Sequence, residues 1–250
     1  MELDFAFFAF AIPAVIFAGI SKGGFGSGAA FVAAPLMALV VEPALALGIM
    51  LPLLMLIDLS VLRPYWGRWD LRGSWLVIAG GLPGVALGAT LYQYASPDTF
   101  RILIGGISLA FVAWQLGQAW RKRRPERAPI GLAGGLVTGI TAGFGSFISH
   151  AGGPPVAVYL LSRGFDKTTY QASSVLIFWA INIFKAVPYT FLGIFTWETL
   201  TVDLYLAPFT MIGVYIGVKA HWMLPERLFF SITYVLLVVT GSKLLWDGLT

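Results

Sequence analysis

The sequence of 250 residues has no cysteine, only two histidines and little charge. Without cysteine there is no disulfide, no thiol nucleophile and no thiolate metal site. Charged residues make up 11% of the chain, whereas about a quarter is usual in soluble domains. The His-Glu-x-x-His and P-loop motifs are absent as well. These absences exclude a soluble globular domain and argue against an enzyme, so we expect no catalytic residues, no metal site and no cofactor.

Long apolar runs fill the sequence: hydrophobic residues account for 58% of the chain and the mean hydropathy is +0.83. Residues 44–62, 73–95, 99–120 and 228–249 are each about 20 residues long, enough for a helix to cross about 30 Å of hydrocarbon. Their apolar residues surround the helix and do not alternate, which excludes the strands of an outer-membrane barrel. The sequence therefore predicts an all-α polytopic membrane protein in a lipid bilayer.

Positive charge is concentrated in four segments. Residues 63–72, 121–127, 163–167 and 219–227 contain twelve of the sixteen cations. Because Lys and Arg accumulate in cytoplasmic loops, we expect these segments inside and the N- and C-termini outside. The net charge of +4 then reflects orientation in the cytoplasmic (inner) membrane, and we expect no nucleic-acid partner.

Two glycine-rich segments interrupt the apolar sequence at corresponding places. Residues 21–28 read Ser-Lys-Gly-Gly-Phe-Gly-Ser-Gly, and residues 141–155 read Thr-Ala-Gly-Phe-Gly-Ser-Phe-Ile-Ser-His-Ala-Gly-Gly-Pro-Pro. Irregular backbone at membrane depth survives only where protein or a water-filled cavity surrounds it, and paired breaks are typical of transporter binding sites. The charge pattern requires residues 5–41 and 130–161 to return to the side from which they enter. We therefore predict two hairpins with glycine-rich tips.

The halves of the sequence match in order on either side of the polar run 121–129; for example, Gly19 corresponds to Gly139 and Gly84 to Gly213. Matches in a common order indicate duplication. The charge pattern starts the first half outside and the second inside, so we predict inverted repeats, each a glycine-tipped broken-helix hairpin plus three full transmembrane helices. The predicted parts are a first repeat, a basic cytoplasmic linker and a second repeat, namely residues 1–120, 121–129 and 130–250.

The glycine-rich tips also carry the residue types that bind anions. A glycine loop before a helix offers unpaired N–H groups and the positive end of the helix dipole, Lys22 adds a cation, and His150 adds a titratable donor. Three alternatives stay open: the glycines only allow close packing, Lys22 reaches the cytoplasmic interface, or His150 satisfies backbone carbonyls. The predicted substrate-binding residues combine tip glycines, hydroxyls and cations: Ser21, Lys22, Gly24, Gly26, Ser27, Thr141, Gly145, Ser146, Ser149, His150 and Gly153.

Three further polar residues, Asp58, Asn182 and Lys185, lie within runs that read as full helices. Lys185 follows Asn182 by three positions and therefore shares its helix face. We expect the three residues to line the pathway, and Asp58 to be a candidate carrier of a coupling proton because burial disfavours its charged form. The alternative is a purely structural pair between Asp58 and Lys185.

Residues 19–35 and 139–155, together with the two-half architecture and the size, make the chain similar to the TauE/SafE sulfite exporter family. The resemblance implies a transporter that moves sulfur-containing anions, such as sulfite, sulfoacetate and related organosulfonates, across the cytoplasmic membrane. We expect a secondary transporter that exports such an anion by alternating access. The alternatives are a passive anion channel and a non-transporting membrane scaffold subunit, and a homodimer stays an alternative to a monomer.

Overall fold

A computed structural model describes residues 4–25, 30–120, 130–220 and 226–250, and the described chain is helical without strands. Seven helices are long and apolar enough to cross a membrane, so the all-α polytopic membrane fold is confirmed. The elements in chain order are α1 (Phe5–Ile20), η1 (Ser21–Phe25), η2 (Ala30–Val32), α2 (Ala33–Met37), α3 (Pro43–Leu62), α4 (Leu71–Tyr94), α5 (Pro97–Trp120), α6 (Leu132–Ser149), α7 (Gly153–Ser162), α8 (Lys167–Phe191), α9 (Trp197–Ala220) and α10 (Glu226–Leu249).

Capping residues set where several of these helices begin. The carboxylates of Asp4 and Asp70 accept hydrogen bonds from N–H groups in the first turns of α1 and α4. Proline at the start of α3, Pro43, fits the first turn because no N–H partner is needed there. Asp166 accepts the N–H groups of Thr169 and Thr168 at the start of α8, and these bonds hold the pKa of its carboxyl below the usual value.

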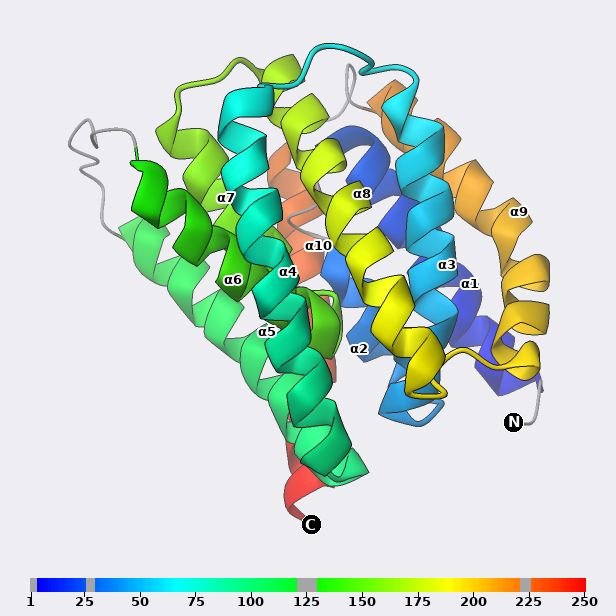
Figure 1. The fold of residues 1–250 in the computed structure, drawn as a ribbon. Helices are drawn as coiled ribbons and strands as arrows, with labels where there is room; N and C mark the ends of the chain where they lie inside the picture. Colours follow the sequence, from blue (N-terminus) through cyan, green and yellow to red (C-terminus); the bar gives the residue numbers. More distant parts are fainter. Residues whose placement is uncertain (1–3, 26–29, 121–129, 221–225) are drawn as a thin grey trace.

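In the described residues α1 packs against α2 and α6 packs against α7, as the two predicted hairpins require, and three long helices follow each pair (Figure 1). Corresponding helices run in opposite directions: α1 against α6, α3 against α8, α4 against α9 and α5 against α10. Opposed directions are what inverted repeats require. The inverted repeats, the duplication and the division at residues 121–129, which lie outside the described residues, stay predictions.

Each hairpin packs against a long helix of the other half. Gly80 and Gly84 of α4 meet the backbone of α6, and Gly213 and Gly217 of α9 meet the backbone of α1. An added Cβ at Gly217 would lie 2.5 Å from the Ile20 carbonyl oxygen, so glycine is what permits this approach. Gly84 meets the carbonyl of Ile140 and Gly217 meets the carbonyl of Ile20, so these two glycines occupy equivalent places in the two halves. The sequence comparison paired Gly84 with Gly213 instead, which is one helical turn away.

The two termini of the bundle lie at the same end, opposite the loops at residues 63–70 and 163–166 (Figure 1). Two of the four segments that the charge pattern places on one side therefore lie at one end of the bundle, while residues 121–127 and 221–225 lie outside the described residues. The cations that break the pattern at the other end are Arg101 and Lys243, and each forms an ion pair, with Asp98 and Asp247 respectively. Paired with a carboxylate, neither weighs strongly against the charge pattern.

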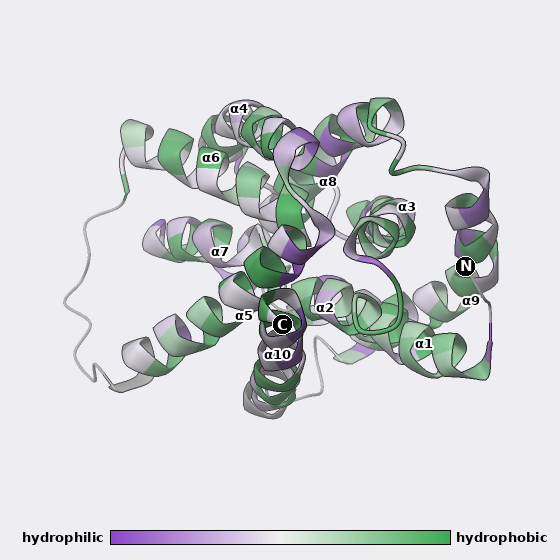
Figure 2. Ribbon diagram, turned by 90° about the horizontal axis from the view of Figure 1, so that it is seen from below, coloured by the Kyte–Doolittle hydropathy of each residue, from purple (hydrophilic) through white to green (hydrophobic). Residues whose placement is uncertain are grey.

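At the centre of the bundle the two halves also meet where α3 packs against α8. Seen from below, α1 and α9 flank this pair on one side, and α4 and α6 flank it on the other (Figure 2). Large apolar side chains such as Ile57 on α3 and Ile177 on α8 are fully buried. Asp58 of α3 and Asn182 and Lys185 of α8 lie on this central pair and are buried in that core.

Candidate functional site

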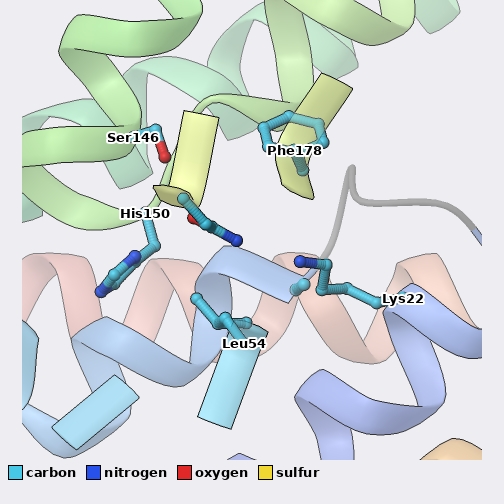
Figure 3. Close-up of a pocket in the computed structure, with 7 residues that line it drawn as sticks. Lys22, Leu54, Ser146, His150 and Phe178 are labelled. Atoms are coloured by element: carbon cyan, nitrogen blue, oxygen red, sulfur yellow. The ribbon is translucent and has the colours of Figure 1, made fainter. Parts of the chain in front are cut away.

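A small cavity lies where both hairpins reach the central helices (Figure 3). Its free space is about enough for one water molecule, so a larger ligand enters only after lining side chains move apart. The residues that line it come from η1, η2, α3, α6 with its end residue, and α8: Lys22, Ala30, Leu54, Ser146, His150, Phe178 and Asn182.

Lys22 of η1 forms an ion pair with Asp58 of α3 beside this cavity. The two side chains are buried, with 3% and 0% of their surfaces exposed. Asn182 of α8 donates its amide N–H to the second oxygen of Asp58 at 2.7 Å. Since buried charges are costly unless paired and hydrogen-bonded, this triad ties the first hairpin, α3 and α8 together.

Lys185, one turn beyond Asn182 on α8, makes a second buried group. Its ammonium Nζ donates to the Ser146 carbonyl at 3.0 Å and lies 2.7 Å from Nδ1 of His150. His150 Nε2 lies 3.3 Å from the Leu47 carbonyl oxygen. Unlike Lys22, Lys185 forms no ion pair with a carboxylate of the described residues.

The backbone at both hairpin tips departs from regular α-helix. His150 ends α6 in the left-handed region, with φ of 55° and ψ of 14°, and is the only non-glycine described residue there. That conformation costs an L-residue about 1–2 kcal/mol and is concentrated at functional sites.

In the first hairpin the chain turns π-helical over η1, which also marks functional segments. The freed carbonyls of Lys22 and Gly23 accept hydrogen bonds from Gln171 Nε2 at 2.6 Å and Tyr65 Oη at 3.3 Å. These two donors hold η1 in place beside the cavity.

Charge is unbalanced inside this cluster. Two lysines and one aspartate are buried there, and Nδ1 of the one imidazole lies 2.7 Å from the Lys185 Nζ. An isolated buried charge is expensive, so an excess ammonium favours a negatively charged ligand. The arrangement can therefore bind an anion in the cavity between Lys22, Ser146 and His150.

The structure gathers six of the sequence-predicted residues at this place. The predicted alternative, a pair between Asp58 and Lys185, is wrong, because Asp58 pairs with Lys22 and accepts from Asn182, while Lys185 contacts the end of α6. The six gathered residues are the cavity-lining Lys22, Ser146, His150 and Asn182 and, behind them, Asp58 and Lys185.

Other predicted residues support the hairpins without lining the cavity. Gly24 packs on α9, and Gly153 begins α7. In α6, the Ser149 hydroxyl donates to the carbonyl of Gly145 at 3.2 Å. Ser21 is buried in η1, where residues 19–23 read Gly-Ile-Ser-Lys-Gly; this is the spacing of a nucleophile elbow, but the backbone here is helical and not a strand-to-helix turn.

Two expectations for the glycine-rich tips require correction. Thr141 is exposed, and its hydroxyl donates to the Val137 carbonyl of its own helix, so it faces away from the cavity. The segment 141–149 is helical and not an open loop, because α6 continues to Ser149 and packs its glycines on α4. Only residues 150–152 break the helix there, and Gly26 and Ser27 lie outside the described residues.

Sequence reasoning missed several residues of the site. Phe178 and Leu54 line the cavity, yet an apolar residue in an apolar helix gives no signal. Gln171 and Tyr189 could have been found from the sequence, since polar groups in membrane helices need hydrogen-bond partners. The Tyr189 hydroxyl donates to the Phe147 carbonyl at 2.8 Å and stabilises the end of α6 behind His150.

Seven apolar spans around a buried cluster of ionisable groups define a polytopic membrane protein of the transporter class, because such groups at membrane depth mark transport pathways. The family model described as sulfite exporter TauE/SafE matches residues 11–244. The chain therefore belongs to this family of membrane transporters, which confirms the resemblance seen in the sequence. No curated protein and no solved structure matches the chain.

Proposed function

We propose that this protein is a secondary transporter that exports a small sulfur-containing anion, such as sulfite, sulfoacetate or a related organosulfonate, by alternating access. The observation that carries the proposal is the buried cluster with more lysines than carboxylates at the contact between the two halves. Family membership supports the sulfur anion as substrate.

Lys22, His150 and Ser146 are the residues we assign to the anion. Lys22 and His150 line the same cavity from opposite hairpins (Figure 3). The Ser146 side chain borders it too and provides a hydroxyl for an oxyanion oxygen. Asp58 and Asn182 act through Lys22 by fixing the position of its ammonium.

Alternating access is supported by the small size of the cavity and by the opposed hairpins. Because the cavity holds no more than about one water molecule, the substrate-bound state requires a rearrangement of the elements around it. Oppositely directed halves that share one central site commonly open to the two sides in turn. The membrane potential assists export, since moving one negative charge out of the cell is favourable by about 2.3 kcal/mol per 100 mV.

The test is counterflow in proteoliposomes loaded with unlabelled sulfite or sulfoacetate and supplied with the labelled anion outside. A carrier accumulates label transiently and saturates. Non-saturating flux without counterflow indicates the passive channel. If neither anion moves faster than in empty liposomes, the transport proposal fails and a scaffold role is favoured.

A pair of lysine variants tests the site in the same assay. We expect Lys22→Gln to abolish counterflow and Lys243→Gln, at an exposed ion pair, to retain it. Normal counterflow by Lys22→Gln would remove Lys22 from the binding site while leaving the transporter class intact.

A further inference from the structure

The two buried lysines have different partners. Lys22 faces the carboxylate of Asp58, whereas Lys185 lies beside the Ser146 carbonyl, the His150 imidazole and the Tyr189 ring and pairs with no carboxylate of the described residues. An ammonium has three N–H donors, and the contacts with the carbonyl and the imidazole use two of them. Lys185 and His150 therefore form a pair of basic groups joined by one hydrogen bond.

The hydrogen bonds fix the tautomer of His150. A carbonyl oxygen only accepts, so the Nε2 that faces the Leu47 carbonyl carries the hydrogen. Nδ1 is then the acceptor of the Lys185 N–H at 2.7 Å. In this arrangement His150 is neutral, and its unprotonated nitrogen already points at an ammonium.

Among the described residues, none that surrounds His150 supplies a free counter-charge for another proton. Lys185 and Tyr189 face it from α8, Lys22 lies across the cavity on η1, and Asp58 of α3 is already engaged by Lys22. The charged residues described on α4, α5, α6 and α7 make no hydrogen bond or ion pair with the ring. A proton on His150 would thus join two ammonium groups in a buried site, which is unfavourable without an anion.

An anion in the cavity supplies that counter-charge, because His150 lines the cavity and the Lys22 ammonium stands at its other side. With two ammonium groups and one carboxylate the cluster carries an excess of one positive charge. A proton on His150 raises the excess to two charges, which matches a dianion such as sulfoacetate.

Resting on the proposed function, we propose that the Lys185–His150 pair takes up one proton from solvent when a dianion binds in the cavity. The proton bonds to Nδ1 of His150, and the Lys185 ammonium gives up its hydrogen bond to that nitrogen and keeps the one to the Ser146 carbonyl. No other covalent bond changes. Export of the dianion with this proton still moves one negative charge outward, so the membrane potential continues to assist it.

The test is calorimetric titration of the purified full chain with sulfoacetate at neutral pH, in two amine buffers that differ in ionisation enthalpy. The sulfonate and carboxylate of this probe are both ionised there, so the ligand contributes no proton. Each proton that the protein takes up is released by the buffer, so the difference in binding heat between the two buffers gives the number of protons taken up. We expect about one proton per bound sulfoacetate. Sulfite, at a pH where it is a dianion, is the second probe.

His150→Gln keeps a donor and an acceptor in place of the imidazole but cannot be protonated, so we expect its proton uptake to fall to zero. The matched control is His221→Gln, at the only other histidine of the chain, which should take up as many protons on sulfoacetate binding as the wild type.

Binding by the wild type with identical heats in both buffers overturns this inference and leaves the anion site standing. Absence of binding by both probes overturns the proposed function as well. Should His150→Gln fail to fold, the wild-type buffer comparison alone decides the question.

Discussion

At the residue scale, the properties of the site follow from which charges are paired. Asp58 forms an ion pair with Lys22 and accepts a hydrogen bond from Asn182. Lys185 instead contacts a carbonyl and an imidazole. Removal of one member of a buried ion pair leaves an uncompensated charge, whereas removal of both members can cost little. The stabilities of single and double variants of Lys22 and Asp58 should therefore differ measurably.

Asp58→Asn should lower the free energy of unfolding by about 3–5 kcal/mol, because the Lys22 ammonium loses its counter-charge in the interior. The double variant Lys22→Met with Asp58→Asn should recover most of that loss, since no charge remains and the introduced amide oxygen can still accept from Asn182. Thermal unfolding in detergent measures both, and counterflow should be lost in each. A double variant that is no more stable than Asp58→Asn would contradict the pairing.

Asp203 offers the opposite case. It lies in the second turn of α9 with 7% of its surface exposed, and neither of its carboxylate oxygens has a hydrogen-bond partner among the described residues. Burial of an unpaired polar group costs about 1–3 kcal/mol. We expect Asp203→Asn, which has no charge, to raise the unfolding temperature at neutral pH. A lower unfolding temperature would show that the carboxylate is stabilised in place.

At the element scale, glycine decides how closely the hairpins approach the long helices. Gly139 of α6 lies against Gly80 of α4, and a Cβ at Gly139 would be 2.7 Å from the Gly80 Cα atom. Gly19 of α1 has the same relation to α9 in the other half. These contacts hold the hairpins that carry His150 and Lys22.

Gly139→Ala should therefore destabilise the protein by about 1–3 kcal/mol, as overpacking of a tight contact does. The matched control is Gly106→Ala on α5, where a Cβ would meet nothing within 4 Å. Alanine there should be neutral or stabilising by up to about 1 kcal/mol, because glycine is the poorer helix former. The comparison is made by thermal unfolding; equal effects of the two substitutions would contradict the close packing.

At the scale of the whole molecule, the remaining question is which end of the bundle faces the cytoplasm. The charge pattern assigns the loops at residues 63–70 and 163–166 to the inside. The absence of cysteine makes this easy to test, since a single introduced cysteine is the only thiol in the chain.

In intact cells, a membrane-impermeant maleimide should label Trp197→Cys, at an exposed position near the other end, and should spare Trp66→Cys and Phe165→Cys until the membrane is opened. All three should react after solubilisation, which controls for buried thiols. Labelling of Trp66→Cys in intact cells would show that the loop at residues 63–70 lies outside the cell, opposite to the orientation that the charge pattern predicts.

The membrane helices could be predicted closely because hydrophobicity and length decide them locally. Lys22, His150, Ser146 and Asn182 could be proposed for the site since polar residues are conspicuous in apolar runs. The sequence did not reveal that α6 stays helical through Ser149, because its glycines are stabilised by packing on α4 and not by their own propensity.

The sequence by itself determined the class of fold, the positions of the long apolar helices, the clustering of the loop charges and the family. Each helix position depends on composition within about 20 residues, which is the scale on which a bilayer selects helices. Tertiary structure alone decided that Asp58 pairs with Lys22 and that Lys185 meets His150. Those contacts join residues far apart in the chain, and their geometry is set by helix packing and not by any local pattern.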